Sequence, residues 1–444
     1  MAFFFRQRYP IVLSPDQHTI SRAHVEREVL DIMRHLQRNG HQAFLVGGCV
    51  RDILLGKKPK DFDIATDARP RQVKKLFRKC FLIGRRFRLA HVYISKDRFV
   101  EVATFRAMAE AEQAGEGKYA ANNVFGDIEE DALRRDFTMN ALYFNAADST
   151  IVDYSGGLRD IKKRVVRSIG DPVERFTDDP VRIIRAARFS AQLGFSLSRK
   201  DHRAALKCAP LIKQSSDARL LEELYKILRC GASLATLMNL SREGLLAHWL
   251  PEVSVLIKSD DFKKRIEAVD RRRREGADIP NAVLIAVLIY DLLDETVRSA
   301  AGLNQQDLFA LLQGAHRDMV VRMRVPRREW DIICNIISRL DLFTEPRQGK
   351  TRQRNENRFI QNVNFGSALL FFEILSEATG LYREELRYWK KRAAEKRERP
   401  ERAAVTSEQP SREQAPKEGK RRRRRPRRRG PRKPAETGAA PPTP

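Results

Sequence analysis

Two patterns of apolar residues divide the chain into regions of different secondary structure. From about His24 to Phe144, short apolar runs of strand length are mixed with helical segments, and the runs cover residues 43–46, 62–65, 91–94, 99–104 and 141–144. Past Val166, apolar residues recur almost everywhere at helical spacing, in segments 181–193, 218–229, 234–240, 279–293, 306–312 and 330–340. We therefore predict an α+β fold, with an N-terminal α/β head around a small mixed sheet, followed by an all-helical neck and body.

The same patterns predict the boundaries of the regions. Apolar periodicity stops near Arg392, and the composition beyond it cannot bury enough apolar surface to fold alone. Between Arg106 and Asp127 the sequence is small, polar and glycine-containing, so we expect a mobile loop there. We predict a head at 24–150, a helical neck at 151–250, a helical body at 251–391 and a disordered Arg-rich tail at 392–444.

The charge of the chain favours a polyanionic partner. Its 444 residues carry a formal net charge of +27, an excess that suits nucleic acid or an anionic membrane surface, with nucleic acid as the better interpretation. In the segment 420–433, eleven of fourteen residues are Lys or Arg. Such a run is either a solvated or targeting tail or, as we expect at this density, a contact to RNA phosphates that adds affinity without base specificity.

Other features of composition limit the cellular context. The chain has no run of about 18 apolar residues, and its opening MAFFFRQRYP is too short an apolar stretch for a signal peptide, so we expect a cytoplasmic protein without membrane insertion. The five cysteines are widely spaced and never form CxxC pairs, which argues against a disulfide framework and against a zinc site.

The strongest chemical motif is the segment FLVGGCVRDILLGKKPKDFDI, residues 44–64. Here a strand leads into Gly47 and Gly48, and paired glycines before a helix allow the backbone to approach a phosphate closely. A second strand then carries Asp61 and Asp63, which project from the same face because strand side chains alternate. Two such carboxylates can share Mg²⁺ ions and support metal-dependent phosphoryl chemistry.

A third acid and a nearby cation extend this motif. Glu101 lies in the apolar strand FVEVATF, where a charged residue needs a partner, and it is the best candidate for the third carboxylate. Arg51, on the helix after the glycines, is a nucleotide-binding candidate or only the partner of Asp52 in a helix ion pair. Taken alone, each feature is also compatible with an ordinary turn or surface position.

Two further motifs carry groups suited to a nucleotide. In RRDFTMNAL, residues 134–142, Arg134 could hold a triphosphate and Asp136 could accept a hydrogen bond from a ribose hydroxyl; the alternative is a surface basic pair before a buried element. In DDPVRIIRAARF, residues 178–189, we expect Pro180 in the first helical turn behind an acidic cap.

The second of these motifs pairs a carboxylate with a guanidinium. Asp179 and Arg182 are spaced i, i+3, as in a simple intrahelical ion pair. An acceptor beside a donor also complements the base edge of adenine or cytosine, whereas guanine and uracil would leave polar groups unpaired. This reasoning does not choose between adenine and cytosine.

Together these motifs resemble those of the class II nucleotidyltransferase family, which comprises bacterial poly(A) polymerases and the CCA-adding enzymes that finish tRNA ends. The likeness spans residues 24–250 and rests on GGCVRDILLG, DFD, VEVATFR, RRDFTMNAL and DDPVRIIRAARF, with Asp178 where the family's EDxxR motif commonly has Glu. It implies a catalytic head, a nucleotide- and RNA-binding neck, an RNA-binding body, two Mg²⁺ ions on Asp61 and Asp63, and Glu101 as the candidate third acid. The nucleotide-binding residues that we predict are Gly47, Gly48, Arg51, Arg134, Asp136, Asn140, Asp179, Arg182 and Arg185.

Within this family, the segment LIGRRFRLAHV, residues 82–92, resembles the stretch that marks bacterial poly(A) polymerases. The resemblance implies addition of AMP from ATP to RNA 3′ ends (mRNA, sRNA and tRNA precursors), a role in RNA decay, and RNA-decay proteins as partners. A CCA-adding enzyme is the alternative, because the base-reading pair fits both. A non-catalytic RNA-binding protein fits the basic tail equally well, and a phosphohydrolase is disfavoured because the eight histidines are scattered.

Overall fold

The structure is a computed structural model that describes residues 9–84, 89–107, 125–344 and 356–405. The chain divides into two units, Met1–Arg392 and Ala393–Pro444. The helical pattern predicted to stop near Arg392 continues in α21, Arg383–Val405, because this segment is rich in Ala, Glu, Lys and Arg, which favour helix without an apolar stripe. The predicted basic tail beyond Val405, most of the predicted loop, and Arg85, Arg86 and Arg88 lie outside the described residues.

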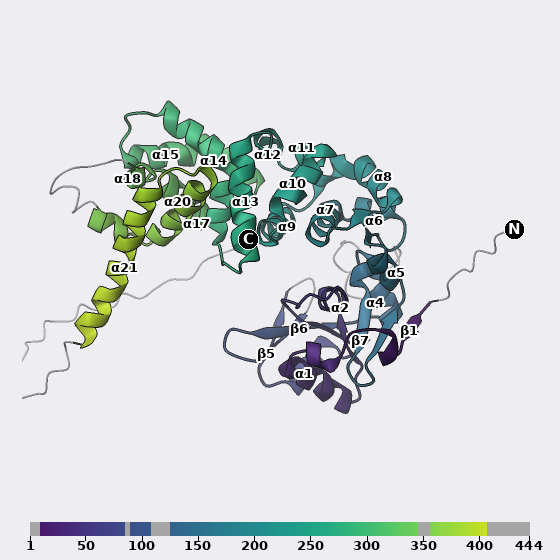
Figure 1. Ribbon diagram of the computed structural model, residues 1–444. Coiled ribbons are helices and arrows are strands. Elements are labelled where there is room, and N and C mark those ends of the chain that lie inside the picture. The colour runs from purple at the N-terminus through teal and green to yellow at the C-terminus, as the bar shows by residue number, and fades with distance from the viewer. Residues whose placement is uncertain (1–8, 85–88, 108–124, 345–355, 406–444) are drawn as a thin grey trace, which may run out of the picture. The chain divides into compact units, whose positions relative to one another are not determined.

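The head contains an eight-stranded mixed sheet with the order β1-β8-β7-β2-β3-β6-β5-β4 (Figure 1). β3 and β6 are parallel, and the other neighbouring strands are antiparallel. The predicted strands at 43–46 and 99–104 coincide with β2 and β6, whereas β1, β4 and β8 were not predicted. The strands are β1 Ile11–Leu13, β2 Ala43–Val46, β3 Asp63–Thr66, β4 Cys80–Ile83, β5 Leu89–Tyr93, β6 Phe99–Thr104, β7 Leu142–Asn145 and β8 Thr150–Asp153.

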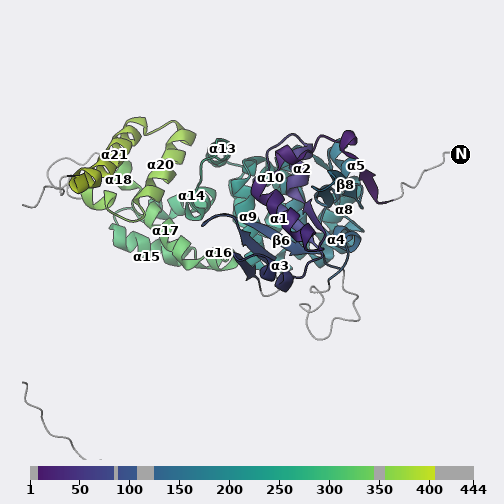
Figure 2. The same ribbon diagram turned by 90° about the horizontal axis from the view of Figure 1, so that it is seen from below.

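The two faces of this sheet are covered differently. The first face packs against α1 (Arg27–Arg38), α2 (Gly48–Leu54) and α3 (Pro70–Leu76) in one continuous apolar core, and α1 lies beside the strands in both views (Figures 1 and 2). On the second face, a smaller core packs beneath α4 (Ile128–Arg134). Its strand residues belong to β2, β3 and β7, so α4 covers only part of this face.

The chain beyond the sheet is helical, as predicted, apart from a two-stranded parallel ladder of β9 (Val165–Val166) and β10 (Ser196–Leu197). The predicted helix at 181–193 coincides with α7. Among the described residues, no helix is both long and apolar enough to cross a membrane. The helices are α5 Gly157–Lys162, α6 Pro172–Asp178, α7 Val181–Leu193, α8 Arg199–Cys208, α9 Asp217–Arg229, α10 Ser233–Arg242, α11 Leu245–Trp249, α12 Pro251–Leu256, α13 Asp260–Arg274, α14 Asn281–Ser299, α15 Gln305–Ala315, α16 Arg317–Arg322, α17 Arg327–Ile337, α18 Asp341–Thr344 and α20 Phe365–Thr379.

Candidate active site

The glycine pair forms the turn from β2 into α2, as its sequence predicted. Gly47 caps α2 with a φ of 81°, a conformation that side-chain-bearing residues rarely adopt. A Cβ atom at Gly47 would lie 3.6 Å from Arg135 Nη1 and 3.9 Å from the carbonyl oxygen of Asn140. The turn therefore brings backbone close to the cationic segment that follows α4.

Asp63 and Glu101 are direct neighbours across the sheet. Asp63 opens β3 and is in register with Glu101 on β6, and Phe62 packs toward the core as expected. Asp61 lies two residues before β3 rather than within it. The acids therefore gather at one end of β3, with Asp61 on the loop that leads into it.

Loss of hydration to neighbouring protein and, after it, like charge raise the pKa values of these acids. The pKa of Asp63 is raised to about 6, first because surrounding protein displaces water from its carboxylate and then because Glu101 and Asp61 repel its negative charge; Arg135 acts in the opposite direction. Burial also raises the pKa of Glu101, against the attraction of Arg106 and Lys226. The negative charge at this site is thus only partly compensated by the protein.

Such a site fits a divalent cation in charge and in donor type, because hard carboxylate oxygens are the ligands that Mg²⁺ prefers. Within the described ranges, however, no three or more His, Cys, Asp or Glu side chains are grouped closely enough to form a complete metal site. The acids could therefore supply only part of a coordination sphere; substrate phosphates commonly supply the rest in Mg²⁺ enzymes.

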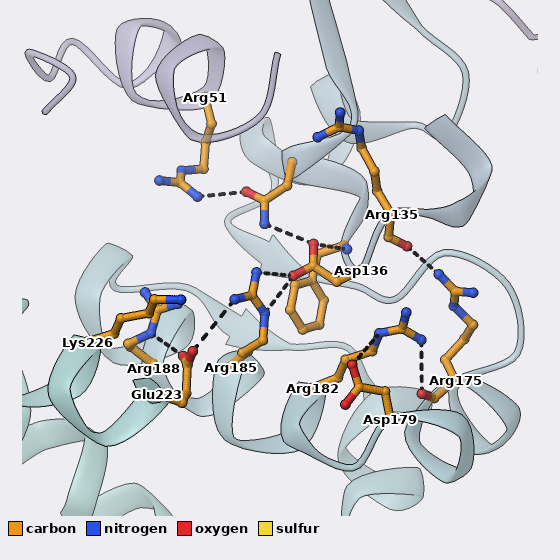
Figure 3. Close-up of polar contacts among 12 residues, drawn as sticks. Arg51, Arg135, Asp136, Arg175, Asp179, Arg182, Arg185, Arg188, Glu223 and Lys226 are labelled. Carbon is orange, nitrogen blue, oxygen red and sulfur yellow. Dashed lines mark hydrogen bonds and ion pairs between the residues drawn. The ribbon is translucent and has the colours of Figure 1, made fainter. Parts of the chain in front are cut away.

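A second set of residues forms a continuous polar chain from α2 to α7 (Figure 3). Arg51 Nη1 donates to Asn140 Oδ1 at 2.7 Å, and Asn140 Nδ2 donates to Asp136 Oδ1 at 3.2 Å. Arg185 then donates from Nε and Nη2 to Asp136 Oδ2, at 2.9 and 2.6 Å. Although burial acts to raise it, the pKa of Asp136 is lowered to about 2 by Arg185 and Asn140. Arg51 also contacts Asp52, with Nη2 to Oδ1 at 2.7 Å, so both of its predicted roles are compatible with the geometry.

The polar chain continues into α9 through Glu223. This carboxylate is 2% exposed and accepts from Arg188 Nε at 2.5 Å, while Arg185 Nη1 lies 3.6 Å away. The guanidinium groups of Arg51, Arg185 and Arg188 all lie over the ring of Phe189, at 5.1, 5.5 and 4.3 Å from its centroid. Three guanidinium groups therefore surround the ring of Phe189 and the carboxylates of Asp136 and Glu223.

Arg134 and Arg135 have different surroundings although they are adjacent in sequence. Arg135 Nη2 donates to Asp131 Oδ2 at 2.9 Å, and Nε donates to Tyr143 Oη at 3.1 Å. Arg134 Nη1 is buried and has no hydrogen-bond partner among the described residues, and burial lowers the pKa of this side chain to about 10, with a further contribution from Arg106. The backbone carbonyls of Arg134 and Arg135 both accept from Arg175 Nη2, at 2.5 Å each.

Asp179 and Arg182, the pair predicted to read the base, lie near each other, but helix α7 begins differently from the prediction. Asp179 is the C-cap of α6 and Pro180 is itself the N-cap of α7, so Asp179 does not cap α7. The reason is that its carboxylate is bound by Arg219, which donates from Nη1 and Nη2 at 2.8 and 2.7 Å. Arg182 Nε lies 3.8 Å from Asp179 Oδ2, and its Nη1 donates to the Arg175 carbonyl at 3.1 Å.

Several residues of this site were not in the predicted set. Glu223 had a usable signal, because a charged residue inside the apolar helix pattern LLEELYKIL is costly unless it is paired. Arg219 and Arg175 had none, since their partners are remote in sequence or are backbone carbonyls. The other residues of the site that were not in the predicted set are Arg135, Arg188 and Lys226.

An acidic strand end beside a glycine turn, joined to an arginine-rich helical region, is the organisation of a nucleotidyltransferase. Residues 43–167 match the model of the Poly A polymerase head domain, and residues 194–256 match a probable RNA and SrmB-binding site of polymerase A. The chain is 41% identical to Poly(A) polymerase I of Haemophilus influenzae over 344 residues, which cover 73% of this chain and 76% of that protein. It is 40% identical to Poly(A) polymerase I of Escherichia coli over 358 residues, covering 76% of this chain and 77% of that protein. The chain belongs to the bacterial poly(A) polymerase family, and the predicted enzyme class is confirmed.

CCA-adding enzymes are more distant relatives. That of Bacillus velezensis is 36% identical over 227 residues, covering 51% of this chain and 56% of that protein. The fold resembles the crystal structure of the Bacillus stearothermophilus CCA-adding enzyme in complex with CTP, with a TM-score of 0.58 and 26% identity over 83% of this chain and 82% of the other. It also resembles a tRNA nucleotidyltransferase complexed with a primer tRNA and an incoming ATP analog, with a TM-score of 0.55 and 26% identity over 82% of this chain and 99% of the other.

Proposed function

We propose that this enzyme adds AMP from ATP to RNA 3′ ends without a nucleic-acid template and releases pyrophosphate. The observation that carries the proposal is the pairing of Asp63 with Glu101 beside the Gly47 turn, with negative charge that the protein only partly compensates. Asp61 and Asp63 would hold two Mg²⁺ ions, with Glu101 as a further ligand, and the ions would supply positive charge for the 3′-hydroxyl nucleophile and the leaving pyrophosphate.

The triphosphate would be bound by the glycine turn and by cations beside it. Gly47 and Gly48 leave space for a phosphate near Arg135, and the start of α2 offers backbone N–H groups. Arg134 would add positive charge, but its Nη1 is buried without a partner in the described part of the chain, so a phosphate oxygen would reach it only after a local rearrangement. Arg51, held by Asn140 and Asp52, would stabilise the same charge.

Asp136 is suited to bind the ribose. Its low pKa keeps it ionised and therefore an acceptor at physiological pH, and Arg185 and Asn140 fix its orientation. A carboxylate held in this way can accept a hydrogen bond from a ribose hydroxyl without rearranging.

Asp179 and Arg182 would read the base, the carboxylate as acceptor from an exocyclic amino group and the guanidinium as donor to a ring nitrogen. Because Asp179 is bound by Arg219, base recognition would require this ion pair to open or shift.

The preference for adenine over cytosine is supported by the similarity to the Haemophilus influenzae and Escherichia coli enzymes. The RNA ends would be those of mRNA, sRNA and tRNA precursors in the cytoplasm, marked in this way for decay.

The test is extension of a 5′-labelled RNA of arbitrary sequence with Mg²⁺ and one nucleoside triphosphate at a time. Long extension with ATP alone is expected. Extension that occurs only on tRNA lacking its end, and that stops after CCA, would exclude the poly(A) assignment. Asp61→Ala should abolish extension and leave RNA binding unchanged, whereas retained activity would remove Asp61 from the site.

A further inference from the structure

The second face of the sheet has no apolar core over β4 and β5 in the part of the chain that the structure describes. On β4, β5 and β6 this face carries aromatic side chains that touch one after another. Phe81 lies edge-on to Tyr93 with ring centroids 5.5 Å apart, Tyr93 lies 5.6 Å from Phe99, and Phe99 stacks on His91 at 4.0 Å. Phe81 is 60% exposed and Phe99 is 46% exposed. We call Phe81, His91, Tyr93 and Phe99 the aromatic platform.

The platform is continuous with the catalytic acids. Phe81 is in register with His91, His91 with Glu101, and Glu101 with Asp63, so these four side chains form one row across β4, β5, β6 and β3. His91 Nε2 lies 3.7 Å from Glu101 Oε2. Three strand spacings separate the two ends of the row, a distance of about 14 Å.

This arrangement is unusual for an exposed face. Large aromatic side chains are costly to leave in water, and a contiguous exposed group of them usually marks a binding surface. The covered part of the same face, with Val46, Ala65 and Tyr143 beneath α4, shows that this chain can bury such a surface where burial is needed. The exposed part of this face begins at Asp63 and Glu101.

We propose that the aromatic platform binds the unpaired nucleotides just upstream of the RNA 3′ end by stacking their bases, and so guides the terminal hydroxyl to Asp63 and Glu101. The proposal rests on the proposed function, since it assigns the path of the RNA substrate into that site. Stacking on aromatic rings is tolerant of sequence because every base has a π-face, which suits an enzyme that extends many RNAs. Positive charge also lies at the junction, because Arg106 and Lys226 are near enough to Glu101 to oppose the rise in its pKa that burial causes.

A single-stranded nucleic acid fits this surface better than a protein partner. A protein covering the platform would also cover the neighbouring carboxylates, which the reacting RNA end must reach. The flat, exposed rings need no complementary pocket in their ligand. The RNA end satisfies both conditions.

The first experiment measures extension kinetics of the full chain with the double variant Phe81→Ala/Phe99→Ala, using ATP and a single-stranded RNA of twelve nucleotides. The KM for RNA should rise by about 5-fold to about 150-fold for each base that no longer stacks, while the KM for ATP stays the same. Phe81→Tyr, which keeps a ring, should behave as the wild type. Val12→Ala is the matched control, because Val12 is also exposed on this sheet, on edge strand β1. An unchanged KM for RNA, with the variant folded by circular dichroism, would overturn the proposal.

The second experiment does not need activity. RNAs carrying 2-aminopurine at single positions near the 3′ end are titrated with the wild type, and stacking on the platform should quench the fluorescence at those positions but not farther upstream. The double variant should lose this quenching. Equal quenching in both proteins would overturn the proposal that the aromatic platform binds RNA. A double variant that changes only self-association in analytical ultracentrifugation would overturn it too. If the wild type extends no RNA, the proposed function fails, and the fluorescence result still decides the platform.

Discussion

The two groups of carboxylates in this enzyme are treated in opposite ways by the surrounding protein. At the strand ends, Asp63 faces Glu101 and its pKa is raised to about 6, because burial and like charge outweigh the attraction of Arg135. Between α4 and β7, Asp136 is bound by Arg185 of helix α7 and its pKa is lowered to about 2. An ion pair that is complete within the protein positions side chains, whereas an incomplete one leaves charge for a ligand to neutralise.

The largest effect should come from neutralising Asp63, whose negative charge the protein only partly compensates. Asp63→Asn keeps the shape of the side chain but removes the charge that we propose binds Mg²⁺, so the kcat for AMP addition should fall on the order of 10³-fold or more. The free energy of unfolding should not decrease, because the substitution also removes repulsion with Glu101. Extension assays and urea denaturation measure the two quantities. A large loss of stability together with activity would mean that Asp63 is a structural residue.

Neutralising a carboxylate whose charge is compensated within the protein should instead lower the free energy of unfolding. Glu223→Gln leaves the guanidinium groups of Arg185 and Arg188 short of a buried counter-charge, and should lower the free energy of unfolding by about 3 kcal/mol. The measurement is urea denaturation followed by circular dichroism.

The same helix provides the control for that substitution. Glu222 is exposed and pairs with Lys226 one turn away, so Glu222→Gln should cost about 0.5 kcal/mol or less. Equal losses in the two variants would show that Glu223 does not act as a buried counter-ion.

An intermediate case is Asp179, whose complete ion pair must open if it reads the base. Arg219→Ala removes a partly exposed partner worth about 0.5 to 1 kcal/mol and should lower the KM for ATP about 2-fold to 5-fold. Arg324→Ala, which breaks an exposed pair with Asp217 in the same helix α9, should leave that KM unchanged. A higher KM for ATP in Arg219→Ala would instead make Arg219 a positioning residue for Asp179.

The sequence predicted the parts of this site that are local and missed those made by distant segments. The Gly47 turn and α7 follow from short patterns, and the helical remainder follows from periodicity over many residues. The ion pair between Asp179 and Arg219 joins residues forty positions apart, and no local pattern specifies it. For the same reason the expected acidic cap of α7 was wrong, since a tertiary partner competes with the helix N-terminus for the carboxylate.

Asp63 and Asp136 should also differ in how their contributions to stability depend on pH. Because the folded-state pKa of Asp63 is about 6 and its ordinary value is 3.8, the folded protein binds this proton more tightly, so its contribution to stability is lost as pH rises from about 4 to 6. For Asp136 the sign is reversed, and its contribution is lost as pH falls from about 4 to 2. The residue Asp63 is more than a third exposed, so solvent screening should keep its effect below about 1 kcal/mol. Urea denaturation of wild type and Asp63→Asn at pH 4, 5, 6 and 7, without Mg²⁺, measures it. Parallel pH profiles of the two proteins would contradict the assignment of an uncompensated charge to Asp63.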